Sequence, residues 1–276
     1  MVLVIVVKDI LTEITAALKP HISRASREAQ LLLMAFLEVD ELWLLTNQNK
    51  QIKNTKKLYE MVARRAKNEP YEYIVNSVSF YSEEFYIASG ALIPRPETEL
   101  LIDAVLKEKP NLDEEIHFVE VGVGSGIISI ILALRYKNAK FIAVDISQDA
   151  LNIAQINRDK FGLEKRIELR LGSLLECVDE GIDYLVSNPP YIENGVELES
   201  NLAYEPQNAL FGGEVGDEII KKLLDDVLSR NIKFFSCEMG YDQKGKITSY
   251  LKDKDYKDLA FYKDLAGFDR GFTLRL

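Results

Sequence analysis

Three glycines lie in the short segment 122–126, which reads Gly-Val-Gly-Ser-Gly between two apolar stretches. This order predicts a turn between a strand and a helix. Glycine lets the backbone turn sharply and approach a bound ligand closely. Ile127 stands where a dinucleotide-binding GxGxxG loop has its third glycine, and no Lys-Ser/Thr pair follows to form a phosphate-binding P-loop. The segment is therefore either a plain tight turn or a binding loop of another kind.

Acidic residues near this loop indicate which ligand it binds. A GxGxG loop that follows a strand with an acidic residue, here Glu120, resembles motif I of class I methyltransferases, which bind S-adenosylmethionine. Asp145 ends the next predicted strand, nineteen residues after Gly126. A carboxylate at that edge of a sheet can accept both hydroxyls of a ribose. The alternative is that Asp145 caps the helix that begins near Ser147.

A second loop, Asn188-Pro189-Pro190-Tyr191, follows the strand-like segment 184–187. Its two prolines remove N–H donors and restrict the backbone, so the loop is expected to be stiff. A rigid turn would explain the prolines, but not the amide before them or the aromatic ring after them. The loop resembles motif IV of amino methyltransferases, which act on the amino group of adenine or on glutamine amides.

The residue types of this second loop suit methyl transfer to a planar nitrogen. Such a nitrogen is a poor nucleophile because its lone pair is delocalised, so the lone pair must be turned toward the methyl carbon. The side-chain oxygen of Asn188 and the backbone oxygen of Pro189 can accept its two N–H bonds and meet the charge that develops on nitrogen. Tyr191 can stack on the planar group. We therefore predict Asn188, Pro189 and Tyr191 as catalytic residues that need no strong general base.

The elements that carry these loops alternate between strand and helix. This order predicts an α/β fold with a doubly wound, mostly parallel sheet and helices on both faces. The predicted strands are 116–121, 141–144, 167–171, 184–187 and 232–237, the predicted helices are 127–136, 150–161 and 218–229, and 256–262 with 271–276 would form a terminal antiparallel pair.

The first seventy residues have a different pattern, which predicts a small helical bundle. Apolar residues at 10, 11, 14, 17 and 18 follow helical spacing up to Pro20, and Ser26 and Thr55 are expected to cap two further helices. From residue 71 to 87, β-forming residues interrupted by a turn-like 82–84 predict a β-hairpin. The predicted domains are a substrate-recognition bundle over 1–72, a hairpin linker over 73–92 and a methyltransferase domain over 93–276.

A loop with two prolines leads from this hairpin into the apolar helix predicted at 100–106. Its residues Glu97 and Glu99 have the composition of an acid–base pair. We instead expect Glu97, Thr98 and Glu99 to lie at the helix N-terminus, where side-chain caps and negative charge are favourable.

Composition excludes several functional classes. The 276 residues hold 34 Lys+Arg against 44 Asp+Glu, a net charge of −10, whereas a dedicated nucleic-acid binder carries a basic face. We therefore expect no direct contact with nucleic acid. Cys177 and Cys237 form no CxxC, and the chain has only 2 histidines, so we expect neither a metal site nor a Ser-His-Asp triad. Because no apolar run reaches membrane-spanning length and no signal peptide is apparent, we expect a cytoplasmic protein without membrane contact.

Further segments resemble one family, the peptide chain release factor glutamine methyltransferases, or HemK family. Segment 92–99, Leu-Ile-Pro-Arg-Pro-Glu-Thr-Glu, is similar to the family's interdomain signature, and 64–74 to its linker entry. Segment 204–213, Tyr-Glu-Pro-Gln-Asn-Ala-Leu-Phe-Gly-Gly, resembles its loop after motif IV, and 238–243 with 264–270 its C-terminal pattern. The likeness extends from about residue 60 to the end.

This resemblance implies an S-adenosyl-L-methionine-dependent enzyme that methylates the glutamine of the Gly-Gly-Gln motif in class I release factors. S-adenosyl-L-homocysteine would be the second product. The implied substrate-binding residues are Asn188, Pro189, Pro190 and Tyr191. The implied cofactor-binding residues are Gly122, Val123, Gly124, Ser125, Gly126, Asp145 and Asn188.

One departure concerns the adenine end of the cofactor. Many relatives have Asp where Gly172 stands, and that carboxylate can accept a hydrogen bond from the adenine amino group. Here the contact must be absent, or supplied by a backbone carbonyl or by Ser173. We therefore include Ser173 among the predicted cofactor-binding residues, although it could equally be a plain loop residue.

Three alternatives remain open at this stage. An adenine amino methyltransferase acting on DNA or RNA would share both motifs, but the net charge and segment 92–99 disfavour it. A glutamine methyltransferase of a large-subunit ribosomal protein is closer, although segment 92–99 fits the release-factor branch better. A non-catalytic binding module would not need the amide of Asn188.

Overall fold

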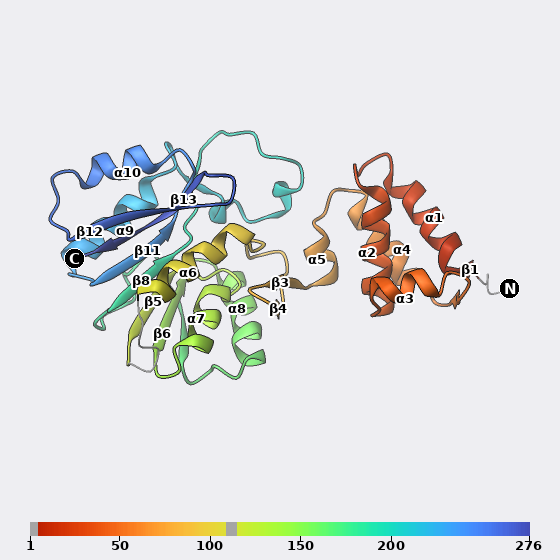
Figure 1. Ribbon diagram of the computed structural model, residues 1–276, viewed down its shortest axis with the longest axis horizontal. Coiled ribbons are helices and arrows are strands. Elements are labelled where there is room, and N and C mark those ends of the chain that lie inside the picture. Colours follow the sequence, from red (N-terminus) through yellow and green to blue (C-terminus); the bar gives the residue numbers. More distant parts are fainter. Residues whose placement is uncertain (1–4, 109–114) are drawn as a thin grey trace. The chain divides into compact units, whose positions relative to one another are not determined.

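The computed structural model describes residues 5–108 and 115–276, which fold into two compact units (Figure 1). The smaller unit ends at Asn76 and also includes the distant segment Glu199–Tyr204. The larger unit comprises Ser77–Leu198 and Glu205–Leu276. The chain therefore leaves the larger unit after residue 198, joins the smaller one for six residues, and returns at residue 205.

The larger unit is built on one sheet with the strand order β12-β13-β11-β8-β5-β6-β7. Its neighbouring strands are parallel except for the two pairings that β13 makes, with β11 and with β12, which are antiparallel. The predicted mostly parallel sheet with a terminal antiparallel pair is therefore confirmed. The strands are β5 (His117–Val121), β6 (Lys140–Asp145), β7 (Ile167–Leu171), β8 (Tyr184–Ser187), β11 (Phe234–Glu238), β12 (Asp258–Lys263) and β13 (Asp269–Arg275).

Helices cover both faces of this sheet, as predicted. Successive strand residues point to opposite faces, so Phe118 packs with one layer of helices and Val119 with the other. The rings of Phe118 and Phe141 on neighbouring strands stack with centroids 4.8 Å apart. Helices α6 (Glu99–Glu108), α7 (Ile127–Arg135) and α8 (Gln148–Lys160) lie on one face, and α9 (Glu218–Ser229) and α10 (Lys244–Leu251) on the other.

The strand order explains where a ligand can bind. Strand β5 lies at the centre, with β6 on one side and β8 on the other. The connections after β5 and after β8 therefore run in opposite directions, which opens a crevice at the carboxyl ends of these strands. Both predicted loops, at 122–126 and 188–191, begin at that edge of the sheet.

The hairpin before the sheet is shorter than the sequence predicted. It pairs β3 (Val78–Phe80) with β4 (Glu83–Phe85), and its turn residues Tyr81 and Ser82 have φ values of 53° and 65°. The predicted turn at 82–84 is therefore wrong by one to two residues. The β-assignment of 73–75 is also wrong, because Tyr71–Val75 forms the short helix α5.

Local residues fix the two ends of α5, and burial accounts for its helical conformation. Pro70 occupies its N-cap position, where the missing N–H costs nothing, and Asn76 ends it with a left-handed φ of 56°. Tyr73 and Ile74 are buried on its inner side. Tertiary burial thus overrides the β-propensity of these residues.

The smaller unit is helical, as predicted, around a core that its longer helices share. Ser26 was expected to cap α2, but that helix begins at Ala25 with Arg24 at the N-cap and no side-chain cap. Thr55 does precede α4, although its side chain makes no capping bond. A short helix that the sequence did not predict is capped by Asp40, which accepts from the N–H of Trp43 at 2.7 Å. The elements are α1 (Val7–Leu18), α2 (Ala25–Leu37), α3 (Glu41–Thr46), α4 (Lys56–Arg65) and a pairing of β1 (Ile5–Val6) with β2 (Gln51–Ile52).

Irregular segments complete the larger unit. A parallel pair of short strands, β9 (Ile192–Glu193) and β10 (Phe211–Gly213), holds the chain that follows the second loop. Short 3₁₀ helices occur at Pro96–Thr98, Leu202–Tyr204 and Gln207–Ala209, of which the middle one belongs to the smaller unit. Within residues 5–108 and 115–276, no helix has both the length and the apolar character needed to cross a bilayer.

Candidate active site

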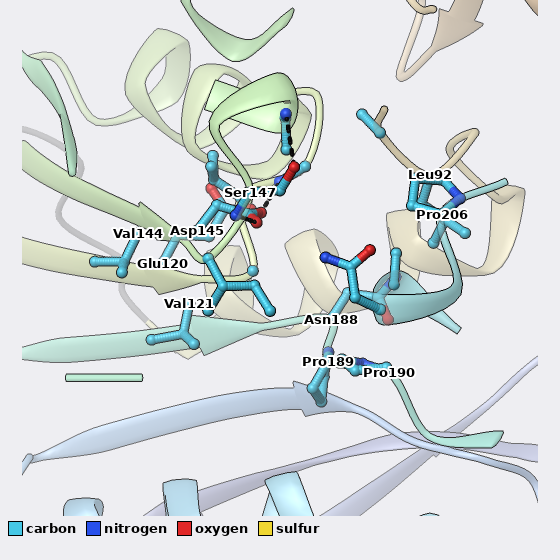
Figure 2. A pocket seen from close by; sticks show the side chains of 18 of the residues that line it. Leu92, Glu120, Val121, Val144, Asp145, Ser147, Asn188, Pro189, Pro190 and Pro206 are labelled. Carbon is cyan, nitrogen blue, oxygen red and sulfur yellow. Dashed lines mark hydrogen bonds between the residues drawn. The ribbon is translucent and has the colours of Figure 1, made fainter. Parts of the chain in front are cut away.

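A pocket opens at the carboxyl ends of β5, β6, β7 and β8 (Figure 2). Its wall is completed by the chain before α6, by residues 206–209, and by one side of α9. All of these segments belong to the larger unit. Of the residues predicted from the sequence, the structure brings nine to this pocket: Gly122, Val123, Gly124, Ser125, Asp145, Ser173, Asn188, Pro189 and Pro190.

The glycine-rich loop is held tightly against β6. The N–H groups of Gly122 and Val123 both donate to the carbonyl of Val144, at 2.9 and 3.0 Å. Gly124 has a left-handed φ of 55°, and a Cβ there would meet no atom within 4 Å, so its backbone faces open space. A ligand can therefore approach the main chain of the loop closely.

Gly126 is not among the residues that line the pocket, and it serves another purpose. Its φ is +85°, and a Cβ there would lie 3.3 Å from Ala154 Cβ and from Ile130 Cδ1. The absence of a side chain lets the start of α7 approach α8. We therefore assign to Gly126 a packing contact, while its predicted role in cofactor binding remains a prediction.

Asp145 points into the pocket from the end of β6 (Figure 2). Its two carboxylate oxygens accept from the N–H groups of Gly124 and Ser147, each at 2.9 Å. Burial raises the pKa of Asp145, and these backbone bonds oppose the rise. The side chain that caps α8 is Ser147, which accepts from the N–H of Ala150 at 3.3 Å. Asp145 is therefore not needed as the helix cap, and its side chain lines the pocket.

Glu120 is fully buried beneath the glycine-rich loop. One carboxylate oxygen, Oε2, accepts from the N–H of Ser129 at 2.9 Å and from the Ser129 hydroxyl. The other, Oε1, has no hydrogen-bond partner in the described part of the chain, and Glu120 is one of the pocket residues. Burial raises the pKa of Glu120 to about 8. A buried acceptor without a partner beside a pocket is a natural place for a donor group of a ligand.

Asn188 projects its side chain into the pocket between Asp145 and the chain near Leu92 and Pro206 (Figure 2). Its Nδ2 donates to Thr98 Oγ1 at 3.2 Å. The Thr98 hydroxyl in turn donates to Glu238 Oε2 at 2.7 Å. Figure 2 also shows Pro189 and Pro190 next to Asn188 at the pocket floor.

Tyr191 is not among the residues that line the pocket. Its hydroxyl donates to Glu238 Oε1 at 3.1 Å, and its ring packs against the core under α9 and α10. Burial raises the pKa of Tyr191, with the carboxylate of Glu238 as the next cause. The last residue of the loop is thus anchored in the protein interior.

Several polar residues that were not predicted as site residues hold the pocket together. Glu205 accepts from the N–H of Ile93 at 3.0 Å and from Arg95 Nη2 at 2.5 Å, which joins two segments of the pocket wall. Glu238 ends the apolar strand β11. Glu238 could have been predicted as a site residue on the same ground as Asp145, because each is a single carboxylate at the end of an apolar strand. Thr98 was expected at a helix N-terminus, where it does lie, but its hydroxyl bonds to Glu238 instead of capping.

The adenine end of the predicted site has a steric feature of its own. A Cβ on Gly172 would lie 2.5 Å from Cys177 Sγ, so a larger residue cannot stand there without displacing Cys177. The N–H of Gly172 donates to the carbonyl of Asp145 at 3.0 Å. Gly172 and the two residues that follow it, Ser173 and Leu174, line the pocket.

Among the described residues, no group of three or more His, Cys, Asp or Glu side chains is placed to bind a metal ion.

Two domain families match separate parts of the chain. The profile of the PrmC N-terminal domain matches residues 9–75, and that of the methyltransferase small domain matches residues 96–210. A solved structure, the hMettl16 catalytic domain in complex with MAT2A 3′UTR hairpin 6, superposes with a TM-score of 0.59. It covers 82% of this chain and 84% of its own at 14% sequence identity, so it supports the methyltransferase fold alone.

Similarity to curated proteins is higher. The release factor glutamine methyltransferase of Clostridium botulinum is 36% identical over 283 residues, 98% of this chain and 99% of its own. That of Koribacter versatilis is 36% identical over 255 residues, 88% of either chain. With two such relatives matched along nearly their whole length, the chain belongs to the release factor glutamine methyltransferase family.

Proposed function

We propose that the protein methylates the side-chain amide nitrogen of the glutamine in the Gly-Gly-Gln motif of class I peptide chain release factors, with S-adenosyl-L-methionine as the methyl donor. The observation that carries this proposal is the position of Asn188, whose side chain projects into the pocket that the glycine-rich loop and Asp145 also line. The proposed amide clamp and the proposed cofactor-binding loop thus line one cavity. The names of the relatives support the same activity.

The residues of the pocket fit the cofactor. When bound, S-adenosyl-L-methionine supplies an electrophilic methyl group. We propose that Asp145 accepts the two ribose hydroxyls and that the unpartnered Oε1 of Glu120 accepts from the ammonium group. Backbone groups of the loop 122–126 would contact the amino acid part, and Ser173 would lie near adenine. Apart from Gly126, each of these assignments uses a residue that lines the pocket in the structure.

The loop 188–191 provides the clamp for the substrate. Asn188 Oδ1 and the carbonyl oxygen of Pro189 would accept the two N–H bonds of the glutamine carboxamide, which turns the nitrogen lone pair toward the methyl carbon. As the new N–C bond forms, positive charge develops on nitrogen and the same two oxygens stabilise it. One N–H proton is then released to solvent. We also propose that the ring of Tyr191 packs against the bound carboxamide while its hydroxyl stays anchored on Glu238.

We further propose that the smaller unit recognises the release factor. Every residue that lines the pocket belongs to the larger unit, so the smaller one is free for another task. Deleting residues 1–70 should then weaken release-factor methylation and leave S-adenosylhomocysteine binding within a fewfold of wild type. A large loss of cofactor affinity would contradict this division of labour.

Release factors act on ribosomes in the cytoplasm, and we propose that the enzyme acts there too.

Mass spectrometry of a recombinant release factor tests the activity directly. Incubation with the protein and S-adenosylmethionine should add one methyl group, about 14 Da by its composition, to the glutamine of the Gly-Gly-Gln motif. A release factor with Gly-Gly-Ala in that position should stay unmodified. Parallel reactions with DNA, RNA and a large-subunit ribosomal protein should incorporate no methyl. Transfer to one of those substrates, with the release factor unchanged, would replace the proposal.

A further inference from the structure

A chain of polar side chains begins in the wall of the pocket, which Asn188 and Thr98 line, and links three separate elements. It passes from Asn188 Nδ2 to Thr98 Oγ1 at 3.2 Å, and from the Thr98 hydroxyl to Glu238 Oε2 at 2.7 Å. The other oxygen of Glu238 accepts from the hydroxyl of Tyr191 at 3.1 Å. Thr98 and Glu238 are only 1% and 3% exposed, so water does not compete for these bonds.

The chemistry of a hydroxyl gives this chain a direction. A threonine has a single O–H donor, and here Thr98 gives it to the carboxylate of Glu238. Toward Asn188, Thr98 can therefore only accept a hydrogen bond. Asn188 must turn its NH₂ group to Thr98, which leaves its carbonyl oxygen for the other side.

The orientation of Asn188 matters because its two ends differ only in hydrogen-bonding character. A substrate carboxamide nitrogen presents two N–H donors and must meet acceptors. If the Asn188 amide were flipped, its NH₂ group would face the N–H groups of the substrate. Donor would then meet donor, and the clamp would repel the substrate nitrogen. The two residues after Asn188 cannot hold its amide in the right orientation through the backbone, because Pro189 and Pro190 have no N–H to donate to the amide oxygen.

We propose that Thr98 and Glu238 are positioning residues that hold Asn188 with its carbonyl oxygen toward the substrate nitrogen, while Glu238 anchors the opposite end of the same loop through Tyr191. This inference rests on the proposed function of the pocket. Neither residue needs to touch the reacting atoms. They act by fixing which group of Asn188 the substrate meets.

The charge state of Glu238 decides whether the chain keeps its direction. Besides Thr98 and Tyr191, the charged and titratable groups that act on Glu238 are Glu97, Arg270, Cys237 and Tyr262. Burial raises the pKa of Glu238 to about 7, and the bonds from Thr98 and Tyr191 oppose the rise. Once Glu238 takes up a proton, it can donate to Thr98, whose own hydrogen is then free to turn toward Asn188. Acid should therefore disorder the clamp.

Valine and serine at position 98 test the role of the hydroxyl. T98V keeps the shape of the side chain and removes the bond to Asn188, so kcat for release-factor methylation should fall by about a hundredfold. T98S keeps the hydroxyl and should stay within about fivefold of wild type. Affinity for S-adenosylhomocysteine by calorimetry should change less than about threefold in both. T248V, which removes an exposed threonine hydroxyl on α10, is the matched control.

A pH profile tests the role of the carboxylate. Wild-type kcat should fall as pH drops through about 7, where Glu238 becomes protonated. In E238Q the side-chain oxygen can still accept from Thr98 and its NH₂ can donate to Tyr191, so the variant should stay active and lose this acid limb. A T98V enzyme with more than a third of wild-type kcat, or an E238Q enzyme with an unchanged acid limb, would overturn the inference. Both readouts are ratios to wild type, so a wild-type enzyme that leaves the release factor unmethylated would instead refute the proposed function.

Discussion

Asn157 Nδ2 lies 2.8 Å from the carbonyl oxygen of Ser125, so a buried side chain of α8 ties down the glycine-rich loop. The same side chain exchanges two bonds with the backbone of Tyr86, whose N–H donates to Oδ1 at 2.7 Å and whose carbonyl accepts from Nδ2 at 2.9 Å. Asn157 is fully buried. The conformation of the proposed cofactor loop thus depends on a residue more than thirty positions away in the chain.

Replacing Asn157 with alanine should therefore weaken both the fold and cofactor binding. N157A leaves three backbone groups without their partner, the buried carbonyl of Ser125 and the half-buried N–H and carbonyl of Tyr86, and we expect the free energy of unfolding to fall by about 2–3 kcal/mol. Affinity for S-adenosylhomocysteine should fall about tenfold, because the loop is no longer held in place. Urea denaturation and calorimetry measure the two effects. N152A, on the exposed side of the same helix, should change stability by less than about 0.5 kcal/mol. Equal results for both variants would contradict the role of Asn157.

Two of the buried glutamates, Glu120 and Glu238, predict an unusual dependence of stability on pH. Burial raises the pKa of Glu120 to about 8 and that of Glu238 to about 7, from an ordinary value of 4.5. At a pH between 4.5 and its raised pKa, each glutamate is therefore protonated in the folded protein but ionised in the unfolded chain. A carboxyl group with a raised pKa contributes its full stabilisation below pH 4.5 and loses it as pH rises through the folded value.

The free energy of unfolding should accordingly fall between pH 5 and 8, by at most about 1.4 kcal/mol per pH unit from each group. Urea midpoints of the cofactor-free protein across this range measure the slope. E120Q and E238Q should each reduce it, since neither variant titrates at that position. E197Q, which removes an exposed carboxylate, should leave the slope unchanged. A wild-type slope of the opposite sign would mean that both glutamates are ionised in the folded protein at pH 5.

The larger unit was predictable from the sequence because its signals are local. Buried parallel strands show as short apolar runs, and the glycine and proline loops mark where each run ends. The segments 167–171, 184–187 and 218–229 were predicted with the bounds that the structure has. The predicted β-structure at 73–75 was wrong because these residues are buried in a helix. Such tertiary burial cannot be predicted from the propensities of the residues themselves.

The site was less predictable, since its supports come from distant parts of the chain. The loops at 122–126 and 188–191 were recognised because each carries its chemistry in consecutive residues. Thr98 and Glu238 are 140 positions apart, and only the fold brings a 3₁₀ helix and a strand end together. The same holds for Glu205, which the sequence grouped with a motif but could not connect to Ile93 or Arg95.

A contact near the predicted adenine end of the pocket leads to a prediction about Gly172. A Cβ at this position would lie 2.5 Å from Cys177 Sγ and 3.0 Å from its Cβ. G172A should thus lower the free energy of unfolding by about 1–3 kcal/mol through overpacking. The double variant G172A/C177A should recover more than half of that loss, because the sulfur is gone.

Urea denaturation of the two single variants and the double variant gives the coupling energy, expected to exceed about 0.5 kcal/mol in the stabilising direction. G181A is the matched control, since a Cβ there meets no atom within 4 Å. Additive effects of G172A and C177A would show that the two residues do not compete for the same space.

Asn188 should be the most sensitive position of the proposed clamp. N188A removes an acceptor for the substrate N–H and also the donor to Thr98, so kcat should fall by at least about a thousandfold. N188D keeps an acceptor but places a charge beside Thr98 and loses that donor, so it too should be slow. Single-turnover assays with saturating release factor separate this loss from binding. N194A, at an exposed asparagine of the following segment, should keep full activity. Turnover by N188A close to wild type would show that the clamp is not used.

Glu205 should control how well the wall of the pocket is assembled. It is 4% exposed and holds Ile93 and Arg95, so E205A leaves a buried N–H and an arginine without partners. We expect a loss of about 3 kcal/mol in stability and a higher KM for the release factor, because segments that line the pocket lose their tie. E205Q can still accept from Ile93 and should lose less. In a cycle of R95A, E205A and the double variant, the double variant should be only slightly less stable than E205A, since both changes remove the same ion pair. Strict additivity in that cycle, with an unchanged KM, would mean that the pair does not shape the site.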